Sequence, residues 1–188
     1  LDFVSLSDPS LGDTESQIKK IEILFNMITK SKFFKNADKP PIVSHTGDGA
    51  AICYLKNPRL PLELAIDLHK KIKSHNNKTK KKQHLQVRIG INSGLIFTTE
   101  GIGQKPNYWG RGINNAQRIM SFGTSNHILL DVTTATELIS LSEKYRKYIH
   151  YLGIVKIKHG EKIPIYSAYD HDFGNKDKPE SLKSQISS

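Results

Sequence analysis

The sequence predicts an α+β domain in which helices cover a mixed or mostly antiparallel sheet. Segments whose apolar residues recur at helical spacing alternate along the chain with short, strand-like apolar runs. Two pairs of these runs are joined by short turns, around Asp48 and at residues 159–162, as antiparallel hairpins require. The 188 residues suffice for one domain with an ordinary hydrophobic core.

The first half of the chain predicts two strands, two helices and a hairpin. Residues 13–15 have N-cap character, and the apolar residues that follow them recur at helical spacing. Asp-Gly between two apolar runs is a strong hairpin signal, because a tight turn needs residues that tolerate positive φ. In chain order, we expect a strand at 1–7, a helix at 14–31, a hairpin at 42–56, a helix from Pro61 to about Ser74 and a strand at 85–97, with Gly94 marking a bulge.

The second half predicts two further helices and three strands. Asp131 precedes an apolar helical pattern and is expected to cap that helix. In chain order, we expect a loop at 101–106, a helix from Ile113 to about Gly123, a buried strand at 127–130, a helix from Asp131 to about Tyr145 and strands at 148–158 and 163–169. Residues 1–170 then form the domain, and residues 171–188 form a polar tail that is disordered or a linker.

The formal net charge of +10 and the pI of about 9.6 raise the question of nucleic-acid binding. The basic residues concentrate at 78–82, in a polar loop without interleaved aromatic residues, so we expect no nucleic-acid partner. A basic surface would also steer an anionic small substrate toward the protein. No apolar run approaches the roughly 20 residues of a membrane-spanning helix, and no signal peptide is visible.

Cys53 is the only cysteine, which excludes an internal disulfide and a zinc site built from cysteines. It lies in an apolar run, so we expect a buried thiol in a reducing, cytoplasmic protein. The chain opens with Leu1 rather than Met and begins inside a strand. We therefore expect a fragment of a longer chain, in which a regulatory domain could lie upstream.

Five motifs follow one another along the chain: a first strand with Asp2, the hairpin with Asp48, and three further segments. These segments read Val-Arg-Ile-Gly-Ile-Asn-Ser-Gly at 87–94, Trp-Gly-Arg-Gly-Ile-Asn-Asn-Ala-Gln-Arg at 109–118 and Ile-Lys-His-Gly at 157–160. Each motif alone is weak, but their order and spacing resemble the catalytic domain of class III nucleotide cyclases, the adenylate and guanylate cyclase family. The resemblance covers nearly the whole chain. It implies a ferredoxin-like fold and an enzyme that converts a nucleoside triphosphate to a 3′,5′-cyclic nucleotide and pyrophosphate.

The resemblance implies two divalent ions, Mg²⁺ or Mn²⁺, held by two aspartates, because hard cations prefer carboxylate oxygens. Asp48 matches the second of these aspartates. If the strand core begins at Phe3, Ser5 takes the position of the first aspartate and the metal site is broken. If the pattern begins at Asp2 instead, every position fits, and we adopt this register. The backbone carbonyl of Phe3 would then also reach a metal.

Two sets of phosphate ligands follow from this register and from the closing motif. The backbone amides of Val4, Ser5, Leu6 and Ser7 would face the triphosphate, as amides often do around phosphates. The resemblance also implies Lys158 as a phosphate ligand by its place in the closing motif, and Lys162 competes for that role.

Asn114 and Arg118 match the transition-state pair of the family. They are four residues apart, so a helix places them on one face. The resemblance implies that Asn114 orients the ribose and that Arg118 neutralises charge developing on the α-phosphate.

The base-reading positions depart from the best-known patterns of the family. Adenylate-type members have a lysine four residues before the second metal aspartate, where this chain has Ser44. They have an aspartate two residues before the Trp-Gly pair, where this chain has Asn107. The glutamate that guanylate-type members place at the first position is also missing. ATP is the default substrate, and a pyrimidine nucleotide is the alternative.

In this family each active site lies between two domains, one with the aspartates and one with the asparagine and arginine. Because this chain carries both sets, the resemblance implies a head-to-tail homodimer with two sites. A degenerate domain that binds nucleotide or only dimerises is the second interpretation, motivated by Ser44, Asn107 and the terminal position of Asp2. A nucleic-acid-binding domain, motivated by charge alone, is the third.

Overall fold

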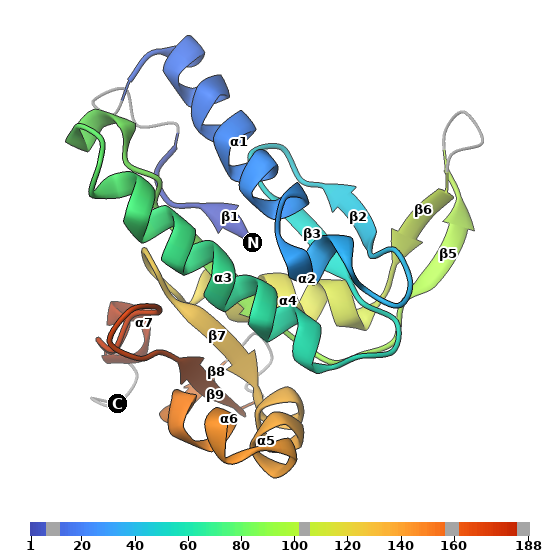
Figure 1. The fold of residues 1–188 in the computed structure, drawn as a ribbon. Coiled ribbons are helices and arrows are strands. Elements are labelled where there is room, and N and C mark those ends of the chain that lie inside the picture. Colours follow the sequence, from blue (N-terminus) through green and yellow to red (C-terminus); the bar gives the residue numbers. More distant parts are fainter. Residues whose placement is uncertain (7–11, 102–105, 157–161, 184–188) are drawn as a thin grey trace.

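The computed structural model describes residues 1–6, 12–101, 106–156 and 162–183 (Figure 1). Its main sheet has five strands in the order β1-β4-β7-β9-β8, and only the β4–β7 pair is parallel. This confirms the predicted α+β class with a mostly antiparallel sheet. In sheet order, the strands are β1 (Asp2–Phe3), β4 (Val87–Ile91), β7 (Ile128–Asp131), β9 (Lys162–Ala168) and β8 (Ile149–Lys156).

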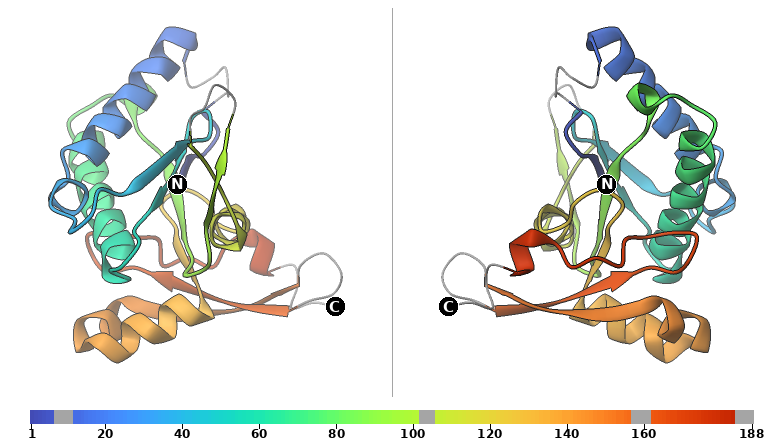
Figure 2. Two further views of the ribbon diagram at one scale, coloured as in Figure 1. Left: turned by 90° about the vertical axis from the view of Figure 1, so that its right-hand side faces the viewer. Right: turned by 90° about the vertical axis from the view of Figure 1, so that its left-hand side faces the viewer.

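Helices cover both faces of this sheet, and the alternation of side chains along the strands decides which face each helix covers. Ile89 and Ile91 point to one face, where they pack with α3, α5 and α6. Leu129 points to the other face, where it packs with Ile119 of α4 and Leu182 of α7. Figure 2 shows α1 and α3 on one side of the sheet and α4 on the other. The long helices are α1 (Thr14–Thr29), α3 (Arg59–Asn76), α4 (Arg111–Ser121) and α5 (Val132–Leu141), and the short ones are α2 (Lys32–Lys35), α6 (Glu143–Tyr148) and α7 (Glu180–Lys183).

The N-caps follow the sequence expectations closely. Asp13 accepts a hydrogen bond from the Ser16 amide at 2.9 Å and starts α1. Asp131 accepts from the amides of Thr133 and Thr134 and starts α5. None of the helices within the described ranges is long and apolar enough to cross a bilayer.

The predicted single strand at 85–97 is wrong, because the sheet strand β4 ends at Ile91. The Ser93 amide donates to the Thr134 hydroxyl at 2.7 Å, and this bond draws the chain away from the sheet. Gly94 then packs against the backbone of Gly112 and marks no bulge. The chain continues into a separate hairpin of β5 (Phe97–Glu100) and β6 (Pro106–Trp109), and β6 was not predicted from the sequence.

The predicted helix from Asp131 to about Tyr145 is divided in two. Ser142 has extended backbone angles, φ −165° and ψ 140°, which end α5. Its hydroxyl accepts from the Lys144 amide at 3.1 Å, so the same residue caps α6.

The predicted disordered or linker tail is wrong for residues 171–183, which fold back onto the domain. Phe173 and Leu182 are buried. Nε2 of His127 donates to the Asp177 carbonyl at 2.8 Å. Two apolar residues among many polar ones are enough to anchor this segment, because each fills a space between elements that are already packed.

Candidate active site

The hairpin predicted around Asp48 is present as β2 (Ile42–His45) and β3 (Ala50–Cys53). The Thr46 amide donates to the Gly49 carbonyl at 3.0 Å and closes the turn. Gly47 has φ +80°, a conformation that glycine adopts at little cost. The turn therefore holds the Asp48 carboxyl at the tip of two paired strands.

Backbone bonds between Leu1 and Ala50 attach this hairpin to β1. Leu1 donates its N–H to the Ala50 carbonyl at 3.0 Å, and the Ala50 amide donates to the Leu1 carbonyl at 3.1 Å. Gly49 fits tightly at the junction: a Cβ there would lie 2.4 Å from the Leu1 carbonyl oxygen and 3.0 Å from Oδ1 of Asp2. The junction therefore places Asp2 directly beside the turn that carries Asp48.

The side chains of Asp2 and Asp48 meet at this junction. Burial, a hydrogen bond to Asp2 and the negative charge of Asp2 raise the pKa of the Asp48 carboxyl above its ordinary value. Two carboxyl groups in contact cannot both be ionised cheaply unless a cation lies between them. The pair is therefore built to share a proton or to bind a positive charge.

Arg88 supplies one such charge, and it was not among the site residues predicted from the sequence. Its Nη2 lies 3.4 Å from Oδ2 of Asp2, and its charge opposes the rise in the Asp48 pKa. The signal was present in the alternation of β4, which leaves Arg88 opposite Asp2 in the antiparallel register. Its Nε is buried without a hydrogen-bond partner among the described residues, so the guanidinium keeps a free donor at this site.

The backbone after Asp2 only partly fits the predicted phosphate loop. The Val4 amide donates to the Gln86 carbonyl at 2.8 Å, so it does not face a triphosphate, and that prediction is wrong. Ser5 is exposed and has φ +57°, which turns the chain sharply after β1. The Leu6 side chain is buried in the core. Ser7 lies outside the described residues.

The Phe3 carbonyl lies on the hairpin side of β1. Backbone groups two residues apart in a strand point the same way, and those of Leu1 point to Ala50. The carbonyl of Phe3 therefore points toward the edge that carries Asp48, while its side chain is buried. Its role as a metal ligand stays a prediction.

Asn114 and Arg118 share one exposed face of α4, as their spacing predicts. Neither side chain makes a hydrogen bond or ion pair with the described parts of the chain. They do not line the cavity that contains Asp2 and Asp48. One copy of the chain therefore does not bring the two predicted pairs together.

The remaining predicted residues are also apart from the carboxylate pair. Ser44 lies in β2 opposite Ala51, and Asn107 lies exposed in β6. Neither lines the cavity beside Asp2 and Asp48. Lys158 falls outside the described residues, whereas Lys162 is exposed at the start of β9.

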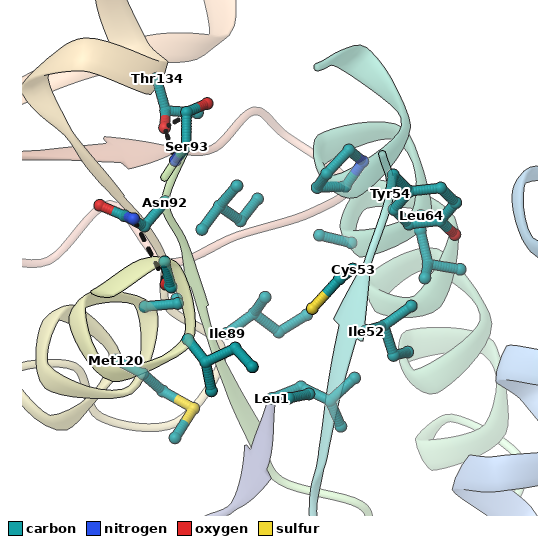
Figure 3. Close-up of a pocket in the computed structure, with 18 of the residues that line it drawn as sticks. Leu1, Ile52, Cys53, Tyr54, Leu64, Ile89, Asn92, Ser93, Met120 and Thr134 are labelled. Atoms are coloured by element: carbon teal, nitrogen blue, oxygen red, sulfur yellow. Dashed lines mark hydrogen bonds between the residues drawn. The ribbon is translucent and has the colours of Figure 1, made fainter. Parts of the chain in front are cut away.

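A cavity of about 490 Å³ extends from the carboxylate pair between β3 and β4, and we call it the central cavity. Leu64 and Leu68 of α3 line one wall, and Ala116 and Met120 of α4 line another. Figure 3 shows Leu1 at one end of this cavity and Ser93 with Thr134 at the other. Cys53 also lines the cavity and is half-buried rather than fully buried, and burial raises the pKa of its thiol.

Comparisons with known proteins agree with this architecture. The model of a family described as the adenylate and guanylate cyclase catalytic domain matches residues 55–168. The matched segment contains Asn114 and Arg118 but neither Asp2 nor Asp48. A comparison with curated proteins found no match.

Solved structures of cyclase domains share the fold. The guanylate cyclase domain of RhGC from Catenaria anguillulae, solved in complex with GTP, has a TM-score of 0.69 at 18% identity, covering 89% of this chain and 92% of that chain. The adenylyl cyclase CyaB from P. aeruginosa has a TM-score of 0.69 at 17% identity, covering 92% of this chain and 93% of that chain. At such low identity, the likeness shows the fold alone.

Proposed function

This chain belongs to the adenylate and guanylate cyclase catalytic-domain family, and we propose that it converts a nucleoside triphosphate, ATP by default, to a 3′,5′-cyclic nucleotide. In this reaction the ribose 3′-hydroxyl loses its proton to solvent, and its oxygen bonds to the α-phosphorus. The bond from the α-phosphorus to the oxygen that bridges it to the β-phosphorus breaks, and pyrophosphate leaves with that electron pair. The observation that carries the proposal is the contact between Asp2 and Asp48, which are far apart in sequence and both line the central cavity.

The chemistry of this pair suits divalent cations. Two carboxylates held in contact, with the pKa of Asp48 raised, are stabilised by a bound Mg²⁺ or Mn²⁺. The described residues contain no cluster of three or more His, Cys, Asp or Glu ligands, so other ligands must complete the shell. We infer that Asp2, Asp48 and the Phe3 carbonyl would hold two ions together with substrate phosphates, as Mg²⁺ usually binds. When bound, the ions would lower the pKa of the 3′-hydroxyl and offset the phosphate charge.

The chain's own residues then position the substrate. The Arg88 guanidinium lies beside the carboxylates, where it can donate to a phosphate oxygen. The chain turns sharply at the exposed residue Ser5, which follows β1 and so comes shortly after Asp2. We propose that Lys158 or Lys162 supplies a further cation to the substrate phosphates.

The site needs a second copy of the chain, because Asn114 and Arg118 lie away from the carboxylates. In a head-to-tail homodimer, each copy would present these two side chains to the carboxylate pair of its partner. Arg118 would then neutralise charge on the α-phosphate, and Asn114 would orient the ribose. Apolar side chains exposed beside the start of α4 suit contact with another protein surface: Leu95 is 73% exposed, Phe97 53% and Trp109 61%.

The proposal is tested by incubating the protein with each of the four nucleoside triphosphates and Mg²⁺ or Mn²⁺, followed by mass spectrometry of the products. We expect a 3′,5′-cyclic product from at least one triphosphate, which also identifies the base. Asp48→Asn should abolish it, whereas the matched control Asp38→Asn, on an exposed loop residue, should leave it unchanged. A demonstrated dimer that forms no cyclic product from any of the four triphosphates would refute the enzyme proposal.

The shared site has its own test. Asp48→Asn and Arg118→Ala should each be inactive alone. Mixed in equal amounts, they should form heterodimers with one intact site each and regain about a quarter of the parent activity. Failure of the mixture, with heterodimers shown to form, would mean that the two residue pairs do not act at one shared site.

A degenerate, nucleotide-binding module is the second candidate. The observations in its favour are Ser44 and Asn107 at the base-reading positions and the Val4 amide, which is already bonded to Gln86. This candidate predicts that a nucleoside triphosphate raises the melting temperature and is recovered unchanged.

A further inference from the structure

The end of α3 and the loop that joins it to β4 carry positive charge without any acidic residue. Residues 68–86 contain seven lysines, no arginine and neither Asp nor Glu. Three of the lysines lie on α3 and bond to carboxylate or carbonyl oxygens: Lys70, Lys71 and Lys73. The other four are exposed and form no ion pair with the described residues, and we call them the lysine patch: Lys78, Lys80, Lys81 and Lys82.

The polar side chains around these lysines bind the backbone of the loop itself. Asn76 closes the loop on Leu85, because its Nδ2 donates to the Leu85 carbonyl at 2.9 Å and its Oδ1 accepts from the Leu85 amide at 2.8 Å. The Thr79 hydroxyl donates to the His75 carbonyl at 3.0 Å, and Nε2 of His84 lies 3.2 Å from the Thr79 carbonyl oxygen. These bonds hold the loop in one shape, with the lysine patch on its outer surface.

The lysine patch lies at the far end of α3 from the proposed dimer surface. Figures 1 and 2 show the loop after α3, coloured green, on one side of the molecule and β5 with β6 on the opposite side. The exposed apolar side chains of Phe97 and Trp109 belong to that opposite side. A partner bound at the lysine patch would therefore leave β5 and β6 free.

The residue types in the loop indicate the chemistry of the partner. Readers of nucleic-acid sequence use arginine forks on base edges or aromatic rings that stack on bases. Residues 76–84 contain no arginine, no Phe, Tyr or Trp, and no aliphatic residue that could insert into a bilayer. Lysine is a compact charge without a preferred partner geometry, which suits the diffuse negative potential of anionic headgroups. Clusters of four to eight basic residues are typical of such surfaces.

We propose that the lysine patch docks this domain on an anionic lipid surface. The attraction is electrostatic and reversible, and no side chain enters the bilayer. Each lysine near the surface increases the binding constant by roughly fivefold, so the four together supply several hundredfold. This inference goes beyond the proposed catalytic function and does not depend on it.

The experiment measures co-sedimentation of the whole chain with vesicles in about 0.1 M salt. The vesicles contain phosphatidylcholine alone or phosphatidylcholine with about 30% phosphatidylglycerol. One variant has glutamine at all four positions of the lysine patch, and four others carry the single substitutions. A matched control loses the same number of charges from exposed lysines elsewhere, replaced by glutamine: Lys30, Lys35, Lys39 and Lys56.

We expect the parent to bind the anionic vesicles at least about tenfold more tightly than phosphatidylcholine alone. Each single substitution should weaken this binding by roughly fivefold and the fourfold variant by about 100-fold or more, whereas the matched control should stay within about threefold of the parent. Salt at about 1 M should release the parent, because it shortens the screening length to about 3 Å. Surface substitutions of this kind seldom disturb a fold, so the variants remain comparable.

Three results would overturn the proposal. The first is equal binding of the parent to both kinds of vesicle, and the second is equal loss of binding in the fourfold variant and the matched control. The third is displacement of the parent from the vesicles by double-stranded DNA or RNA at equal phosphate concentration, because the partner would then be a nucleic acid. No nucleoside triphosphate takes part in the assay, so its failure is separate from failure of the cyclase proposal.

Discussion

Gly90 of β4 lies tightly against α4, the helix that carries Asn114 and Arg118. A Cβ at this position would lie 2.1 Å from the Ala116 carbonyl oxygen and 2.8 Å from the Met120 nitrogen. Both are backbone atoms of α4, so no side-chain rotation relieves the clash. To restore ordinary contact at 3.4 Å, α4 must move away from β4 by about 1.3 Å.

The substitution Gly90→Ala therefore has a calculable cost. Overpacking of this kind lowers the free energy of unfolding by about 1–3 kcal/mol. Alanine also reduces the conformational entropy of the unfolded chain, which offsets up to about 1 kcal/mol of that loss. The net cost is up to about 3 kcal/mol, so for a domain of this size we expect the melting temperature to fall by up to roughly 12 °C. If the chain is a cyclase, displacing the helix that presents Arg118 by about 1 Å should also lower kcat by roughly 100-fold.

The assay is thermal unfolding followed by circular dichroism, with cyclic product formation measured on the same samples below the transition. Gly47→Ala is the matched control, since a Cβ there meets nothing within 4 Å but the residue has φ +80°. It should cost about 1 kcal/mol through its backbone conformation alone and leave α4 in place. A Gly90→Ala protein that melts within about 1 °C of the parent and turns over normally would refute the packing argument.

Three further substitutions test other parts of the structure. Burial, a hydrogen bond to Asp2 and the negative charge of Asp2 raise the pKa of Asp48, so ionising Asp48 as the pH rises past the ordinary carboxyl range destabilises the metal-free fold. Asp48→Asn should therefore raise the melting temperature at pH 7 without metal and abolish the further rise with Mn²⁺. Burial lowers the pKa of His69 from 6.5 to about 4, and its Nδ1 accepts from the Gly174 amide at 3.2 Å. The free energy of unfolding should therefore decrease as the pH drops from about 6.5 toward 4. His69→Gln should make this decrease smaller, as measured by urea unfolding at a series of pH values. Leu182 is 1% exposed, so Leu182→Ala should cost about 2–5 kcal/mol in chemical unfolding; a loss below about 0.5 kcal/mol would mean that the C-terminal segment is not anchored.

Features that depend on neighbouring residues were predicted well. The hairpin at Asp48 follows from Asp-Gly between two apolar runs, and the helix around Asn114 follows from apolar spacing. The caps at Asp13 and Asp131 are equally local. In each case, the turn or helix is determined by backbone preferences and hydrogen bonds within a few residues, which the sequence displays directly.

Features that depend on distant partners were predicted poorly. The strand at 85–97 ends early because the Ser93 amide bonds to Thr134, 41 residues away. The tail beyond residue 170 reads as polar, yet Phe173 and Leu182 anchor it in spaces formed by other elements. The average composition of a segment does not reveal that one or two of its residues fit a particular space in the folded protein.

The sequence by itself therefore determined the α+β class, the catalytic-domain family and the candidate residues on each element. The tertiary structure alone decided which of these residues meet. It places Asp2 beside Asp48 and adds Arg88 to them, because the Leu1–Ala50 and Asp2–Arg88 pairings join three strands at one point. It also leaves Asn114 and Arg118 away from that point, because α4 turns them to an exposed face. Such distances arise from the packing of elements across the whole sheet, and no local pattern in the sequence encodes them.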